Sequence, residues 1–120
     1  VSVEPFYLDQ ESEPDDSHYV WGYQVQIENH GNETVKLERR HWVITDGNGL
    51  THEVEGEGVV GEQPVLEPGE AFEYTSGAPL TTTSGFMTGS YKMKLNDGSY
   101  FDVEIPAFSL DIPTDGRLVH

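Results

Sequence analysis

Residues 19–28 read YVWGYQVQIE, and apolar and polar side chains alternate along this stretch. Every second position carries a large apolar side chain: Tyr19, Trp21, Tyr23, Val25 and Ile27. A period of two is typical of a strand that packs one face on a core and turns the other to solvent. The stretch therefore predicts a half-buried β-strand, and the turn-forming residues 29–32 (Asn-His-Gly-Asn) predict its end.

Strand signals recur on both sides of this stretch. Residues 35–45 carry their apolar side chains first on one parity and then, after Arg40, on the other, which predicts a β-bulge or a bend. Residues 46–49 (Asp-Gly-Asn-Gly) predict a hairpin turn, because Asn and Gly accept positive φ. Further strands are predicted at residues 1–3 (an edge strand interrupted by Pro5), 50–54 and 71–75, and in a hairpin from 91 to 105 that Pro106 ends.

The remaining stretches predict loops and an all-β chain. Residues 9–17 are acidic, residues 56–61 are spaced by glycines, and residues 76–85 are small and polar without a period. No helical period extends over ten residues and no linker divides the chain. Seven to eight short strands with varied connections favour a β-sandwich over a barrel. We therefore expect one domain over residues 1–120, with a tail from about residue 111.

Composition excludes several classes of protein. The 120 residues include 22 acidic and 6 basic side chains, for a formal net charge of −16. Such a chain repels phosphate backbones, so we expect neither a nucleic-acid partner nor a membrane partner. The chain has no cysteine, which excludes disulfides, thiolate metal sites and cysteine nucleophiles. No apolar run reaches the ~18 residues of a membrane span, and a cytoplasmic protein is expected.

Several sequence words, in order along the chain, resemble the bacterial ApaG family. They lie at residues 40–46, 56–64, 68–77, 87–93 and 101–108, and the resemblance extends from the first residues to about Leu110. It implies an immunoglobulin-like or fibronectin-type-III-like sandwich of antiparallel strands. It also implies a recognition module, since ApaG-like domains in eukaryotes are attached to other proteins. The bacterial family is linked to cobalt and magnesium tolerance, and that link must be indirect or regulatory in a chain without a membrane span.

The glycines at Gly56, Gly58 and Gly61 match the string of a dinucleotide-binding motif. That motif works only where a strand precedes it and a helix N-terminus follows it and faces the pyrophosphate. Here residues 62–64 (Glu-Gln-Pro) follow, and no helix is predicted. The pattern favours a tight loop with positive-φ glycines. As an alternative, its backbone N–H groups could bind a small anion such as pyrophosphate or a nucleotide phosphate.

Arg39, Arg40 and His41 form the one basic cluster that the sequence shows. The cluster could hold an anionic group of a ligand or partner, with Trp42 as a stacking surface. The structural alternative is that Arg40 pairs with a carboxylate, while His41 and Trp42 occupy opposite faces of a strand. The sequence leaves both interpretations open.

Carboxylates crowd the loop before the first clear strand. Asp9, Glu11, Asp15 and Asp16, together with Glu13 and His18, could bind a magnesium or cobalt ion, because hard divalent cations prefer oxygen ligands. The spacing resembles no EF-hand, and a solvated acidic loop is the alternative. No other cofactor is expected.

The sequence shows no catalytic constellation. Ser76, His41 and Asp46 are suitable residue types for nucleophilic catalysis, but none lies in a nucleophile elbow. We therefore predict a non-enzyme: a binding module, monomeric or homodimeric, whose loops or exposed strand edge recognise an unknown protein partner. The alternative function is a sensor that binds pyrophosphate, a nucleotide or a divalent cation.

Overall fold

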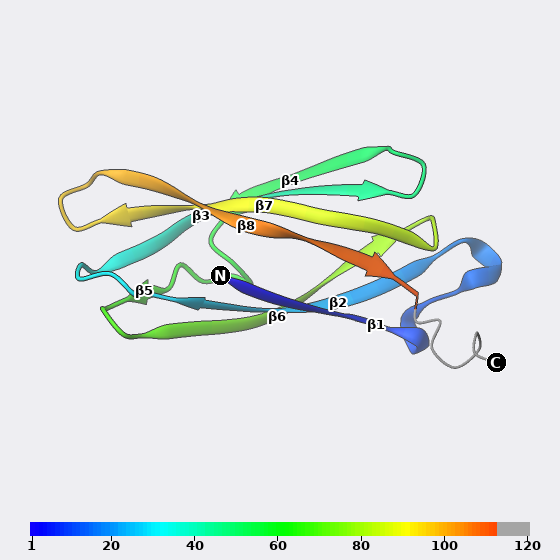
Figure 1. Cartoon of the computed structure of the whole chain (residues 1–120), viewed down its shortest axis with the longest axis horizontal. Coiled ribbons are helices and arrows are strands. Elements are labelled where there is room, and N and C mark those ends of the chain that lie inside the picture. Colours follow the sequence, from blue (N-terminus) through cyan, green and yellow to red (C-terminus); the bar gives the residue numbers. More distant parts are fainter. Residues whose placement is uncertain (113–120) are drawn as a thin grey trace.

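The computed structural model describes residues 1–112, which form eight antiparallel strands in two facing sheets (Figure 1). One sheet has the order β1-β2-β6, and the other has the order β4-β3-β7-β8, with the short β5 also paired to β3. The predicted all-β sandwich is confirmed. The strands are β1 Ser2–Tyr7, β2 Tyr19–Glu28, β3 Val35–Asp46, β4 Thr51–Glu57, β5 Val65–Leu66, β6 Ala71–Leu80, β7 Ser84–Leu95 and β8 Tyr100–Asp111.

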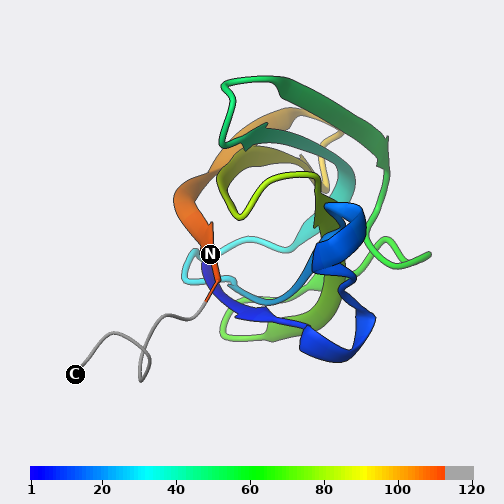
Figure 2. The same ribbon diagram turned by 90° about the vertical axis from the view of Figure 1, so that its right-hand side faces the viewer.

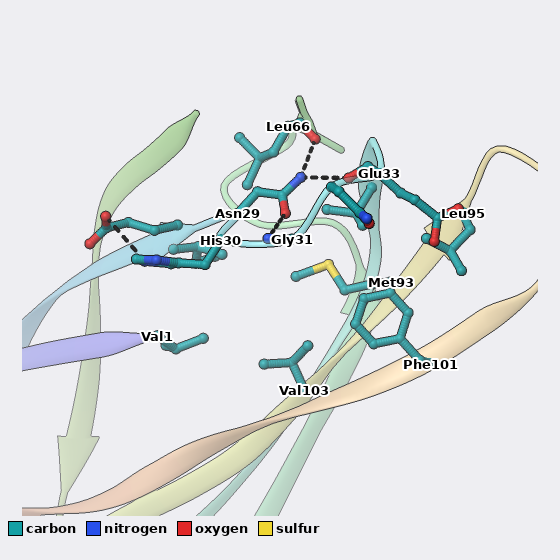
Figure 3. Close-up of a pocket in the computed structure, with 14 residues that line it drawn as sticks. Val1, Asn29, His30, Gly31, Glu33, Leu66, Met93, Leu95, Phe101 and Val103 are labelled. Atoms are coloured by element: carbon teal, nitrogen blue, oxygen red, sulfur yellow. Dashed lines mark hydrogen bonds and ion pairs between the residues drawn. The ribbon is translucent and has the colours of Figure 1, made fainter. Parts of the chain in front are cut away.

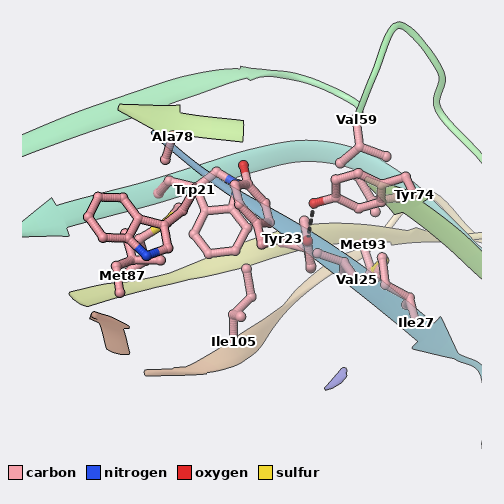
Figure 4. Close-up of a cluster of buried hydrophobic side chains, with 14 of the residues drawn as sticks. Trp21, Tyr23, Val25, Ile27, Val59, Tyr74, Ala78, Met87, Met93 and Ile105 are labelled. Carbon is pink, nitrogen blue, oxygen red and sulfur yellow. Dashed lines mark hydrogen bonds between the residues drawn. The ribbon is translucent and has the colours of Figure 1, made fainter. Parts of the chain in front are cut away.

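The core lies between the sheets. In the end view the strands wrap around a shared interior, and β1 meets β8 along one side (Figure 2). The inward face of β2 is buried as its period of two predicts, since Trp21, Tyr23, Val25 and Ile27 all lie in the core (Figure 4). Residues of β7 and β8, among them Met93 and Ile105, pack against them from the other sheet.

Aromatic rings fill the middle of the core. The ring of Trp42 on β3 lies edge-on to Tyr23, Tyr91 and Phe108, with centroid separations of 5.3, 6.3 and 6.0 Å. Edge-to-face pairs of this kind add to the stabilisation that burial alone supplies. Large aromatic side chains thus fill the core of a chain in which hydrophobic residues make up only 35%.

The irregularity predicted in residues 35–45 is confirmed. The register of β3 against β7 shifts between Leu37 and Arg39, as it does at a β-bulge. Before the bulge the odd-numbered Leu37 is buried, and after it the even-numbered Trp42 is buried. Residues 46–49 form the predicted turn between β3 and β4, with Gly49 at φ +85°.

The prediction of an unstructured stretch at residues 76–85 is wrong. β6 continues to Leu80, and β7 begins at Ser84. Gly77 and Ala78 stand opposite Gly22 and Trp21 in the ladder with β2. The small residues here form a regular strand because β2 supplies the hydrogen-bonding partner, although they show no period of their own.

Neither Pro5 nor Pro106 ends its strand. β1 passes through Pro5 without interruption, and β8 passes through Pro106 to Asp111. Both strands lie at the edge of a sheet, where a missing backbone donor is tolerated. At Pro106 the register with β7 also shifts, between Met87 and Gly89, so the proline falls in a bulge.

The acidic loop forms two single turns of 3-10 helix, η1 Asp9–Glu11 and η2 Pro14–Asp16. Over residues 1–112, no helix has the length and apolar character that crossing a membrane requires. The predicted tail from about residue 111 lies mostly outside the described residues.

Candidate functional site

The glycine-spaced segment forms a tight turn directly after β4. We call residues 58–62 the glycine turn. The N–H of Val59 donates to the carbonyl of Glu62, and the N–H of Glu62 donates back to Val59, both at 2.8 Å. The two residues between them, Val60 and Gly61, have φ of +43° and +80°. Positive φ at both central positions is the geometry of a type I′ turn.

The turn is anchored in the core on one side and exposed on the other. The side chain of Val59 is completely buried and lies beside Tyr74 (Figure 4). Val60, the next residue, is 52% exposed. No helix follows Gly61 within the described chain, because residues 62–64 lead into β5. The context that a dinucleotide-binding motif requires is therefore absent, and the predicted tight loop with positive-φ glycines is what the structure shows.

Arg40 holds the turn against β3. Its Nη1 donates to the carbonyls of Glu57 and Gly58, at 3.1 and 3.0 Å. The guanidinium group crosses Gly56, where a Cβ would lie 2.8 Å from both terminal nitrogens. Gly56 is thus needed for the close approach of Arg40, and it belongs to β4 rather than to the loop. The structural alternative was a carboxylate partner for Arg40, whereas the structure pairs it with backbone carbonyls.

A small polar pocket of about 200 Å³ lies under the glycine turn, between the two sheets. The sequence-predicted residues Arg40, Trp42 and Gly61 line it, so the structure brings the basic cluster and the glycine motif together. Val60 forms part of its wall. Tyr23, Tyr74 and Ser76, on β2 and β6, also line it. No sequence pattern indicates these three residues, because they are far from β3 along the chain.

Three tyrosines next to this pocket stay in their neutral form. The hydroxyl groups of Tyr74 and Tyr91 are hydrogen-bonded to each other in the core. Burial raises the pKa of Tyr74 to about 12, and burial also raises the pKa values of Tyr91 and Tyr23. A neutral phenol can donate or accept a hydrogen bond but is a poor proton acceptor at neutral pH. The pocket is therefore suited to hydrogen bonding rather than to acid–base chemistry.

His41 and Trp42 lie on opposite faces of β3, as the structural alternative predicted. Trp42 is 3% exposed, so it offers no stacking surface on the outside of the molecule and could meet a ligand only inside the pocket that it lines. Bulge geometry turns it into the core, where aromatic neighbours cover it. His41 lies on the outer face of the sheet, and its Nε2 is 2.7 Å from Oε1 of Glu53 on β4.

The acidic residues proposed as metal ligands are not grouped. Within residues 1–112, no set of three or more His, Asp or Glu side chains is placed to hold a metal ion. Asp9, Glu11, Asp15 and Asp16 lie on the two 3-10 turns, and none of them is buried. Binding of magnesium or cobalt by this loop stays a prediction without a ligand set.

The three residue types suited to nucleophilic catalysis occupy separate places. His41 faces outward toward Glu53, whereas Ser76 lines the pocket between the sheets. Asp46 is buried at the far end of β3, where its Oδ1 accepts the N–H groups of Asn48 and Leu50 in the hairpin turn. The structure therefore does not bring these three side chains together.

A second cavity, of about 350 Å³, opens at the end of the sandwich near the turn after β2 (Figure 3). Its walls are mainly apolar, with Met93, Phe101 and Val103 from the larger sheet. The amide of Asn29 supports the rim, because its Nδ2 donates to the carbonyls of Leu66 and Glu33 at 3.0 and 2.8 Å. No sequence motif indicates this cavity, since its lining comes from five separate segments.

The chain matches the ApaG domain model over residues 9–95. The chain belongs to the ApaG family. An ApaG protein of Paramagnetospirillum magneticum is 64% identical over 94% of this chain and 87% of its own length. An ApaG protein of Brucella anthropi is 61% identical over the whole chain and 92% of its own length. A crystal structure described as an ApaA protein from Bordetella pertussis has a TM-score of 0.90 and 47% identity, covering 93% of this chain and 91% of that one.

The resemblance to the ApaG family that the sequence words indicated is thus confirmed. Structures of much lower identity share the fold alone: a protein from Archaeoglobus fulgidus has a TM-score of 0.52 at 10% identity. The names of the ApaG relatives state no activity, substrate or partner.

Proposed function

We propose that this ApaG protein is a non-catalytic module that recognises another protein through its glycine turn. The observation that carries the proposal is the conformation of Val60. A β-branched residue with φ of +43° is a genuine outlier, and holding it there costs of order 1–3 kcal/mol. An Asn or Gly at this position would avoid that cost.

The strained residue is also exposed and rigidly supported. Two backbone hydrogen bonds close the turn, the buried Val59 anchors it, and Arg40 ties the preceding residues to β3. An apolar side chain presented on a rigid turn loses little conformational entropy when a partner covers it. This combination supports recognition of a complementary apolar pocket on a protein surface.

The test uses two exposed valines that differ in backbone strain. Val60→Gly should stabilise the fold, because glycine adopts positive φ freely, and should abolish recovery of a stoichiometric protein with the tagged chain from its native cells. Val65→Gly on β5 is the matched control, because Val65 is similarly exposed, at 56%, but has no positive φ. It should keep the partner.

Two results would contradict the proposal. One is repeated recovery of the bare chain with no stoichiometric protein. The other is equal recovery of the same partner by the Val60→Gly and Val65→Gly chains, which would place recognition elsewhere on the molecule.

A further inference from the structure

The strand β4 has a free edge. It is the outermost strand of its sheet and pairs with β3 alone among the described strands. The N–H of Asp46 donates to the carbonyl of Leu50 at 2.9 Å, so the next pair, Thr45 with Thr51, is the non-hydrogen-bonded kind. By this alternation, the backbone groups of Thr51, Glu53 and Glu55 point away from β3 and are available to another strand.

A mainly apolar hollow, lined also by His18, Asp46 and His52, lies beside this edge. It has a volume of about 440 Å³ and lies between β4 and the end of β6. Ile44 and Val54 line it from the larger sheet, and Pro79 and Leu80 line it from the smaller one. Val54 faces inward from β4 and yet is 41% exposed, because no strand of the smaller sheet covers it.

The opposite face of β4 is acidic. Glu53, Glu55 and Glu57 alternate with the inward-facing residues, and the side chains of Glu53 and Glu55 are 66% and 67% exposed. A strand added to this edge would place its own side chains alternately opposite the hollow and opposite these carboxylates. The edge therefore specifies a pattern: apolar residues on one face and basic residues on the other.

We propose that the free edge of β4 binds an extended segment of a partner protein in which Lys or Arg alternates with apolar residues. Main-chain hydrogen bonds to Thr51, Glu53 and Glu55 supply affinity, and the hollow and the carboxylates supply specificity. The inference rests on the proposed function as a recognition module, but it adds a surface distinct from the glycine turn and names the chemistry of the segment.

The charge pattern argues against a second copy of this chain as the occupant. Two β4 strands paired edge to edge would bring their glutamates face to face, and like charges opposite one another destabilise a ladder. Charged side chains on an edge strand are a common device against self-association. A basic segment, in contrast, gains from these glutamates, of which Glu53 already contacts His41, and from the net charge of −16.

The experiment titrates the full chain with a capped peptide of alternating Lys and Val, seven residues long to match β4. Backbone NMR should show the largest shift changes at Thr51, Glu53 and Glu55. A peptide of alternating Glu and Val should not bind. Shift changes confined to other strands, no change at millimolar Lys-Val peptide, or equal binding of the Glu-Val peptide would overturn the inference.

A pair of variants at one position separates the main-chain contribution from the charge. Glu55→Gln removes the carboxylate and should weaken binding of the Lys-Val peptide severalfold. Glu55→Pro removes the same charge and also the outward N–H, and should weaken binding by at least about tenfold more. Equal affinities of the two variants would exclude strand addition. If Glu55→Pro fails to fold, the comparison of the Lys-Val peptide with the Glu-Val peptide on the unaltered chain still decides the inference.

Failure of this inference can be told apart from failure of the proposed function. The Val60→Gly chain should bind the Lys-Val peptide as tightly as the unaltered chain does, because Val60 lies outside the β4 edge. If the peptide does not bind while the native partner is still recovered through Val60, the edge inference falls and the proposed function stands.

Discussion

Both glycines of the glycine turn, Gly58 and Gly61, have positive φ, but only Gly58 is also required by a close contact. A Cβ on Gly58 would lie 2.1 Å from the carbonyl oxygen of Glu62, a distance that requires the turn to open. A Cβ on Gly61 would meet no atom within 4 Å, so only backbone conformation favours glycine there. At the scale of single residues, the turn explains Gly58 and Gly61 and the approach of Arg40 explains Gly56, so the motif spacing needs no bound phosphate.

This difference predicts unequal costs for the same substitution. Gly61→Ala should lower the free energy of unfolding by about 1–2 kcal/mol, the strain of a left-handed alanine. Gly58→Ala should cost that strain and, for the clash with the turn, about 1–3 kcal/mol more. Urea denaturation followed by circular dichroism measures both. Equal losses would show that the close contact at Gly58 relaxes freely.

At the scale of elements, Arg40 joins β3 to the glycine turn. Arg40→Met keeps the aliphatic stem but removes the two hydrogen bonds to Glu57 and Gly58. We expect a loss of about 1 kcal/mol in stability, since these bonds are partly exposed to solvent. The larger effect should be local: hydrogen exchange at residues 58–62 should speed up relative to β2. Arg39→Met is the control, because Arg39 makes no such bond among the described residues, and it should leave the exchange unchanged.

Elements with a period of their own could be predicted from the sequence, and those that depend on a distant partner could not. β2 was predicted because its buried residues alternate, and the bulge in β3 because the alternation changes parity at Arg40. The second half of β6 could not be predicted, since Gly77 and Ala78 show no periodicity. They form a strand because they pair with β2, where Trp21 stands opposite Ala78. Pro106 was interpreted as a strand end because its bulge is visible only in the register with β7.

The candidate site likewise has one part that the sequence predicts and one part that depends on distant residues. The glycine turn was predicted as a tight loop from its own composition. Its pocket was not, because Tyr23, Tyr74 and Ser76 come from strands of the facing sheet. Trp42 was interpreted as a possible stacking surface because the sequence does not show which side of β3 faces inward after the bulge.

At the scale of the whole molecule, the buried tyrosines make the fold sensitive to alkali. The pKa of Tyr74 rises from 10.0 to about 12 on folding, and that of Tyr91 rises as well, mainly through burial. Between these values the unfolded chain loses protons that the folded chain keeps, so stability must fall as pH increases. Below pH 10 both states keep these protons, and the effect is absent.

We therefore expect the free energy of unfolding to fall as pH rises from 10 toward 12, by up to about 1.4 kcal/mol per pH unit for each such tyrosine. Replacing both Tyr74 and Tyr91 with Phe should flatten this dependence, because the paired hydroxyls leave together. Tyr100→Phe, at an exposed position, should not. If the free energy of unfolding of the double variant falls with pH as steeply as before, other groups cause the loss of stability in alkali.

The chain has two tryptophans, and both are buried, with Trp21 1% and Trp42 3% exposed. Trp21 also donates from Nε1 to the carbonyl of Asp111 at the end of the last strand, at 3.3 Å. Indole emission from this protein is therefore an intrinsic optical reporter of the interior: it should shift to the red only when the two sheets separate. A ligand on the surface should leave the spectrum unaltered, so one fluorimeter trace distinguishes a variant that no longer binds from one that no longer folds.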